Sequence, residues 1–206
     1  MVAHLLFWGD IMKIFSSKKH LVSFTFIAFY FIFSFLGAVR TFSTFTGLLY
    51  DFIGLIPSAL ILCYLLFEQK TFKFKNLIFP LAFGIIAFRS LYGVVFSVIN
   101  TPKYLSFVDA TIILFVLVVV LMFFNILCFC GTLFKFKSSL LLKIGCMGYI
   151  LTTVASQIYE FYLVGGMEYI KTSPINVFAF IQIFSIILFY VGIFILTTNK
   201  KDTDLV

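Results

Sequence analysis

Six long apolar runs, joined by short polar connections, dominate the sequence. Each run is close to the ~20 mainly apolar residues that cross a bilayer as an α-helix. We therefore expect six transmembrane helices, over residues 21–39, 47–67, 77–99, 105–133, 140–165 and 176–198. No connection is long enough to form a soluble domain, so residues 1–206 are predicted to be a single, polytopic, all-α membrane domain, a six-transmembrane-helix bundle.

The overall composition agrees with this interpretation. The chain is 63% hydrophobic and 11% charged, with a mean hydropathy of +1.17, whereas soluble domains carry about 25% charged residues. A water-soluble fold would need polar surface that this sequence does not contain. The formal charge of +7 does not indicate nucleic-acid binding, because the basic residues lie between apolar runs and no polar domain presents them.

The basic residues predict the orientation in the membrane. One set of helix flanks carries eleven of them: Lys13, Lys18, Lys19, Lys70, Lys73, Lys75, Lys135, Lys137, Lys143, Lys200 and Lys201. The opposite flanks carry three: Arg40, Lys103 and Lys171. Because positive flanks stay on the cytoplasmic side, we expect a multi-pass protein of the cell membrane with both termini in the cytoplasm. Residues 1–11, which precede Met12, are expected to be an extension or a short interfacial segment, followed by an uncleaved first helix.

A carboxylate within the fifth predicted helix is the most informative polar residue. Glu160 lies about five residues, or ~7 Å at 1.5 Å per residue, inside the outer helix end. Three small residues precede it at steps of four: Ser156, Thr152 and Gly148. Charges within spans are costly and normally face protein or a water-filled cavity, and small residues let helix backbones approach closely. We expect this face to point into the bundle.

Arg89 is the matching charge, on the third predicted helix, with Gly93 and Ser97 at steps of four. Its long side chain can reach several ångströms toward the outer side, to the depth of Gln157 and Glu160. We expect Arg89 to pair with Glu160, or with Asp51 on the second helix.

Two further charged residues lie at the outer ends of the predicted helices, namely Asp109 on the fourth and Arg40 on the first. Together with Arg89, Glu160, Asp51 and Gln157, they form a predicted ligand-binding or buried charge cluster in the outer half. The alternatives are that Asp51, Asp109 and Arg40 are solvated at the headgroup level, or that Arg89 belongs to a purely structural ion pair.

Gly54 and Pro57 are candidate hinge residues near the middle of the second helix. Proline removes a backbone hydrogen bond and favours a kink, and interrupted helices near the bilayer midplane indicate substrate sites in transporters. A kink that serves packing alone is the other interpretation.

Catalytic and metal-binding patterns are absent from the sequence. It contains no HExxH, GxSxG, P-loop or GxGxxG motif, so we expect no enzyme activity, cofactor or metal. The four cysteines, Cys63, Cys128, Cys130 and Cys146, fall at or below mid-depth on the inner side. Disulfides are rare facing a reducing cytosol, so all four are expected to be free thiols.

The predicted architecture resembles that of small solute-binding membrane subunits, such as the substrate-capturing components of vitamin uptake systems. The resemblance implies a solute-binding or transport subunit that works with a partner membrane subunit or an ATPase-containing complex. Those subunits dock their partner through small residues on the first helix, whereas "VSFTFIAFYFIFSFLGA" here is mostly bulky. The alternatives are a sensor or immunity protein for an extracellular peptide, and a non-catalytic accessory subunit of a membrane complex.

The lysine distribution generates a topology prediction. A reporter fused after Val206 should be active only if it functions in the cytoplasm, because the Lys-rich flanks hold that side inside. Paired cytoplasmic and extracytoplasmic reporter fusions measure this directly. An active extracytoplasmic reporter at this position would mean that the spans are miscounted.

Overall fold

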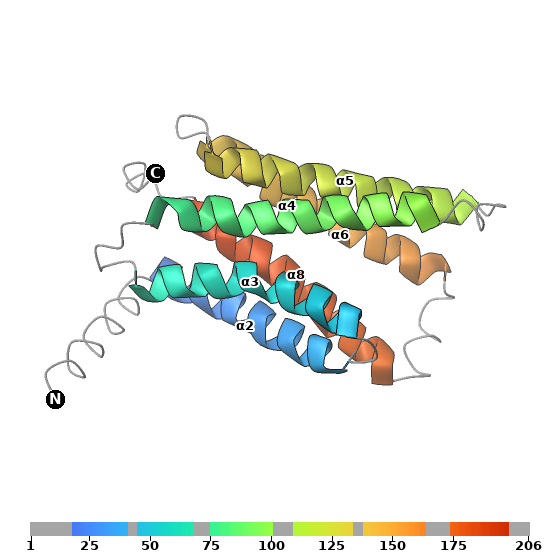
Figure 1. Cartoon of the computed structure of the whole chain (residues 1–206), viewed down its shortest axis with the longest axis horizontal. Coiled ribbons are helices and arrows are strands. Elements are labelled where there is room, and N and C mark those ends of the chain that lie inside the picture. The colour runs from blue at the N-terminus through green and yellow to red at the C-terminus, as the bar shows by residue number, and fades with distance from the viewer. Residues whose placement is uncertain are drawn as a thin grey trace, which may run out of the picture.

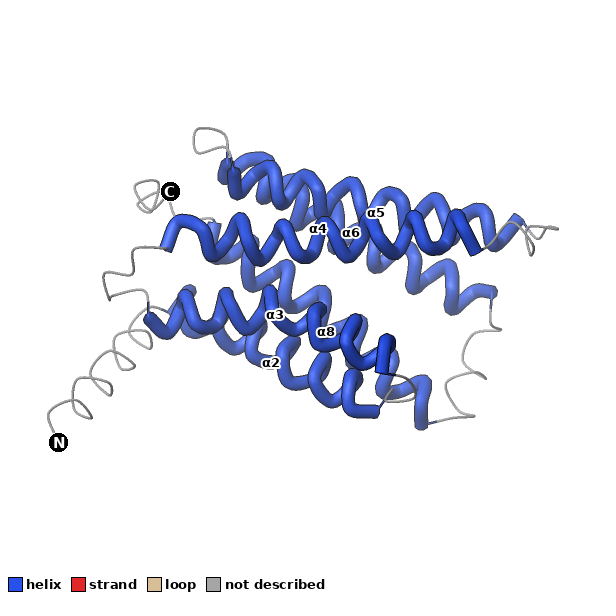
Figure 2. The backbone as a smooth tube through the Cα atoms, viewed as in Figure 1, coloured by secondary structure: helices blue, strands red, loops and turns tan. Residues whose placement is uncertain are grey.

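The computed structural model describes residues 18–40, 45–67, 75–100, 109–133, 138–163 and 174–197, and every one of them is helical (Figures 1 and 2). The six helices, in chain order, are α2 (Lys18–Arg40), α3 (Phe45–Phe67), α4 (Lys75–Asn100), α5 (Asp109–Leu133), α6 (Ser138–Leu163) and α8 (Pro174–Thr197). The predicted all-α, six-helix fold is confirmed. The described part of the fourth predicted helix begins at Asp109, and residues 105–108 lie outside the described residues.

Five of these helices are long and apolar enough to cross a membrane. The exception is α3, whose described apolar segment, Asp51–Leu66, is shorter, although the helix as a whole has 23 residues, or ~35 Å at 1.5 Å per residue. The chain is thus built as a membrane protein. Large apolar side chains such as Phe88 (70% exposed) and Leu151 (64% exposed) cover its outer surface.

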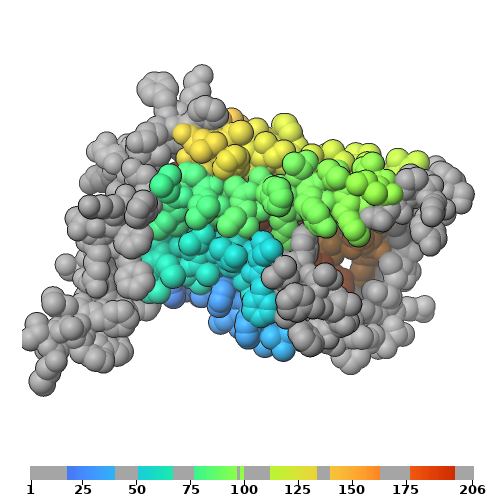
Figure 3. Space-filling model, viewed as in Figure 1, coloured from blue at the N-terminus to red at the C-terminus, as the bar shows by residue number. Residues whose placement is uncertain are grey.

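The helices form a closed ring in which each one packs against its neighbours in the chain. The extensive contacts within the described residues join α2 to α3, α3 to α4, α4 to α5, α5 to α6, α6 to α8, and α8 back to α2. Consecutive helices run in opposite directions (Figure 1). Side chains of α3, α4 and α5 make up most of the described surface on the face seen in Figure 3. The starts of α2, α4 and α6 and the ends of α3, α5 and α8 therefore lie at one end of the bundle.

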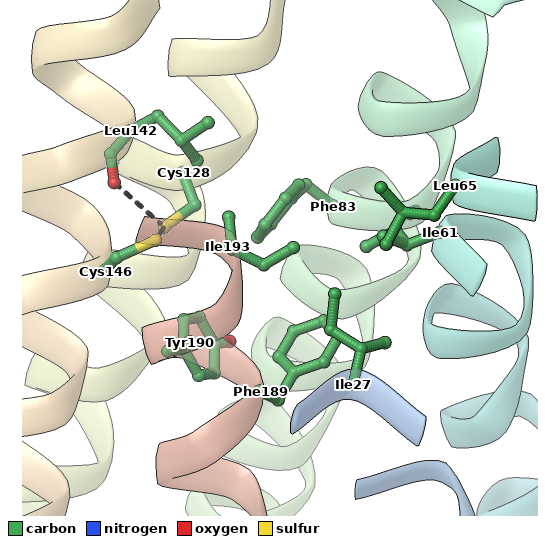
Figure 4. Packing of buried hydrophobic residues seen from close by; sticks show 11 residues of the cluster. Ile27, Ile61, Leu65, Phe83, Cys128, Leu142, Cys146, Phe189, Tyr190 and Ile193 are labelled. Carbon is green, nitrogen blue, oxygen red and sulfur yellow. Dashed lines mark hydrogen bonds between the residues drawn. The ribbon is translucent and has the colours of Figure 1, made fainter. Parts of the chain in front are cut away.

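A tightly packed cluster, which we term the plug, fills the ring at that end. Each helix contributes to it, through Ile27, Ile61, Leu65, Ala82, Phe83, Cys128, Leu142, Cys146, Phe189, Tyr190 and Ile193. Figure 4 shows Ile193 and Phe83 between the two cysteines on one side and Ile61 and Leu65 on the other. In every helix except α2, these residues lie clearly in the half nearer to that end, and Ile27 lies close to the middle of α2.

Glycines bring α5 and α6 into close approach. A Cβ atom at Gly131 would lie 2.6 Å from the backbone nitrogen of Leu142, and one at Gly145 would lie 2.5 Å from Cys128 Sγ and 2.9 Å from its backbone nitrogen. The ring of Phe124 covers Gly148 in the same way. This is the close approach that small residues permit between membrane helices.

The same contact brings two cysteines together without bonding them. Cys128 Sγ and Cys146 Sγ are 4.0 Å apart, and Cys128 Sγ is also 4.0 Å from the carbonyl oxygen of Leu142 (Figure 4). All four cysteines are free thiols, which confirms the expectation from their position in the sequence.

The close approach of α5 and α6 predicts a large effect of a side chain at position 145. Gly145→Leu should lower the free energy of unfolding in detergent by about 1–3 kcal/mol, the usual cost of overpacking, because a backbone atom of Cys128 cannot move aside. SDS titration of the purified variant measures this. Ala155→Leu, on the exposed side of the same helix, is the control and should change the free energy of unfolding little. Equal effects of the two substitutions would contradict the close packing of α5 against α6 at Gly145.

Candidate functional site

A cavity of about 280 Å³ lies inside the ring, next to the plug. All six helices line it, for example through Tyr30, Gly54, Arg89, Asn125, Tyr149 and Tyr190. The lining residues lie mainly in the middle parts of their helices and are displaced from the plug toward the opposite end of the bundle. Packed side chains therefore close the ring on one side of the cavity.

Arg89 brings a charge to the cavity wall and pairs with Asp51. Arg89 Nη2 is 3.5 Å from Asp51 Oδ1, and the two side chains are 31% and 34% exposed. Gly54 lies one helical turn from Asp51, and a Cβ atom there would be 2.6 Å from Arg89 Cζ. The missing side chain at Gly54 is what allows the guanidinium to lie across α3 and reach the carboxylate.

Glu160 is not part of this ion pair. Its side chain is exposed and accepts a hydrogen bond from Gln157 Nε2 on the same helix at 3.2 Å. The expected Arg89–Glu160 pairing is therefore replaced by the alternative with Asp51. Two features explain the difference: α5 lies between α4 and α6 in the ring, and no described residue of α6 after Ser156 is buried.

The small-residue face of α6 does point into the bundle. Thr152 and Ser156 are buried, and Gly148 packs against Phe124. The hydroxyls bond within their own helix, from Thr152 Oγ1 to the Gly148 carbonyl oxygen at 2.8 Å and from Ser156 Oγ to the Thr153 carbonyl oxygen at 2.9 Å. This face thus serves close helix packing.

Of the remaining predicted site residues, some have side chains that the structure describes and others do not. Arg40 ends α2 and Asp109 begins α5, but their side chains, and that of Ser97, lie outside the described part of the structure. Gly93 lines the cavity, as do both candidate hinge residues, Gly54 and Pro57. The helix α3 continues through Pro57, which has no N–H to donate to the carbonyl of Ile53.

A hydrogen-bonded group on the cavity wall, centred on Asn125, was not predicted from the sequence. Tyr190 O–H of α8 donates to Asn125 Oδ1 of α5, and Asn125 Nδ2 donates to Ser90 Oγ of α4 at 2.6 Å. Asn125 is 3% exposed, so three helices share one buried polar contact. The signal was present: Asn125 is the one amide in the interior of the most hydrophobic span.

Aromatic rings from three helices form a continuous part of the same wall. The rings of Tyr149 and Tyr190 stack with centroids 3.9 Å apart, and Phe189 contacts both Tyr190 and Tyr30, at 5.3 and 4.9 Å. Together with the ion pair and the Asn125 group, these rings give a cavity with a mostly apolar wall and a few fixed polar groups. That combination is typical of small-molecule sites. The described residues contain no group of three side chains able to hold a metal ion.

A double-mutant cycle tests the partner of Arg89. Asp51→Asn and Arg89→Gln should each lower the free energy of unfolding by about 1–3 kcal/mol, between the values for exposed and buried pairs, and the double variant should cost less than their sum. Glu160→Gln is the control and should change stability by less than about 0.5 kcal/mol. Stronger coupling of Arg89 to Glu160 than to Asp51 would overturn the assignment.

Comparison with known proteins identifies no relative of this chain. No protein-family model, curated protein or solved structure matches the chain. Its function has to be argued from the cavity itself.

Proposed function

We propose that this protein is a multi-pass subunit of the cell membrane that binds a small solute in the central cavity, as part of a solute-binding or transport system. The observation that carries the proposal is the cavity, which all six helices line. Its volume of about 280 Å³ is just below the ~300–1,000 Å³ typical of small-molecule sites. A cavity of this size fits one small molecule.

The polar groups support binding rather than catalysis. A charged pair in an apolar bundle is costly to maintain, and so is a buried amide. Arg89 of the pair and the amide of Asn125 line the cavity, where a ligand can use them. They provide a guanidinium, an amide and hydroxyls, which orient a ligand, and no arrangement of nucleophile and base among the described residues accompanies them.

The distribution of lysines and the plug together suggest the direction of access. With the Lys-rich flanks in the cytoplasm, the plug lies on the cytoplasmic side and the cavity on its outer side. A solute would then enter from outside and be retained. Release to the cytoplasm would need a rearrangement of the plug, which is the step that a partner membrane subunit or an ATPase-containing complex would drive.

The cavity volume also separates this proposal from the peptide-sensor alternative. A peptide needs a groove along several residues, whereas the space here has a volume of only about 280 Å³. An accessory role without any ligand does not account for the cavity, because packed apolar side chains would stabilise the bundle better.

A cavity-filling variant tests the proposal. Gly93 lines the cavity, so Gly93→Leu should fill part of it and abolish solute binding. The purified protein is heated with a panel of small metabolites and a thiol-reactive dye, which reports unfolding when the buried Cys128 and Cys146 become accessible. A ligand at 100 times its dissociation constant stabilises the folded state by about 2.7 kcal/mol.

At least one metabolite should raise the unfolding temperature of the unmodified protein and of Ala155→Leu, which changes the exposed side of α6. The same metabolite should leave Gly93→Leu unchanged. Failure of every compound, or equal protection of Gly93→Leu, would overturn the proposed function.

A further inference from the structure

We infer that the solute is uncharged at neutral pH and carries a hydrogen-bond acceptor such as a carbonyl oxygen. The inference rests on the proposed function and narrows it to a ligand class. Three features of the cavity carry it: the balance of charge on its wall, the hydrogen-bonding capacity of the Asn125 group, and the apolar remainder.

Among the described residues, the cavity wall carries one full charge, and an opposite charge lies beside it. Arg89 is the one residue among the described lining residues that carries a full charge at neutral pH, and Asp51 lies 3.5 Å from it. Their sum is zero. A neutral solute preserves that balance, whereas an anion or a cation would add an uncompensated charge inside an apolar ring. Desolvating such a charge without a counter-ion costs several kcal/mol.

The Asn125 group offers donors to a ligand. Its Oδ1 accepts from Tyr190, and its Nδ2, which carries two hydrogens, donates one of them to Ser90. These two hydrogen bonds do not use the second Nδ2 hydrogen or the Ser90 hydroxyl hydrogen. Both donors lie at the cavity wall, and Asn125 is 3% exposed. A buried donor without an acceptor costs about 1–3 kcal/mol. A ligand acceptor at this place removes that cost.

The rest of the cavity selects for an apolar body. Five of its apolar lining residues come from α4 and α5, namely Ile85, Ile86, Val118, Leu121 and Met122. Phe189 lines it from α8, where its ring contacts Tyr30 of α2. Burying the apolar surface of a ligand against these side chains contributes roughly 25 cal/mol of binding free energy per Å². The ligand therefore combines an apolar body with one neutral, accepting head group.

A matched set of four probes separates these features, because they share a benzene ring and differ in the head group. Benzamide is neutral and has an acceptor, toluene is neutral and has none, benzoate is an anion, and benzylammonium is a cation. Binding to the purified full-length protein at neutral pH is measured by the thiol-dye unfolding assay and by calorimetry. Benzamide should bind about tenfold or more tightly than each of the other three, a difference of about 1.4 kcal/mol.

Two variants test the charge balance. Asp51→Asn leaves the positive charge of Arg89 and should raise the affinity ratio of benzoate to benzamide about tenfold or more. Arg89→Gln leaves the negative charge of Asp51 and should raise the ratio of benzylammonium to benzamide in the same way. Glu160→Gln removes a carboxylate whose side chain is exposed and bonded to Gln157, and should leave both ratios unchanged.

The outcomes distinguish this inference from the proposed function. If benzoate or benzylammonium binds the unmodified protein more tightly than benzamide, and Gly93→Leu abolishes that binding, the cavity is a solute site but the inference of a neutral ligand is wrong. If no probe and no metabolite of the panel binds, both are wrong. Ratios that respond equally to Asp51→Asn and Glu160→Gln would also overturn the inference.

Discussion

Helices in a bilayer gain no hydrophobic energy from packing together, since lipid tails are as apolar as their side chains. This ring is therefore held by close van der Waals contact, which needs small residues at the points of approach. Gly131 and Gly145 provide it between α5 and α6, and Gly192 provides it between α8 and α2, where a Cβ atom would lie 3.2 Å from the carbonyl oxygen of Ser23. These contacts fix the diameter of the ring, and with it the space that its inner side chains must fill.

The inner side chains fill that space completely at one end of the ring, which is the plug, and incompletely next to it, which is the cavity. Phe83, Phe189 and Ile193 close the ring at one end. Farther along the helices, Gly54 and Gly93 contribute no side chain, and Arg89 turns toward Asp51 across α3. The cavity thus lies at the level of these two glycines, where the ion pair with Asp51 also holds the long side chain of Arg89 to one side.

The amino-acid sequence predicts the elements of this fold well, because the hydropathy of each span is a local property. It also identifies Arg89 and Asp51, since charged residues within apolar runs are conspicuous. It does not identify the pairing, which depends on which helices are neighbours: α5 lies between the helices that carry Arg89 and Glu160. Asn125 could have been found as an amide inside the most hydrophobic span. Its partners Tyr190 and Ser90 could not, because residues 65 and 35 positions apart meet only after the ring has closed.

The order of the helices around the ring has a consequence for synthesis of the chain. Each helix from α3 to α8 packs on the helix that precedes it, so during translation every new span meets a partner that is already in the membrane. The contact of α8 with α2 is the one extensive contact, within the described residues, between helices that are not consecutive among the described helices. Because α8 carries Phe189 and Tyr190, the cavity and the plug are both completed only when α8 is in place. A nascent chain that stops before α8 would lack one wall of the cavity and part of the plug, so the unfinished and the finished chain differ in whether the interior is closed.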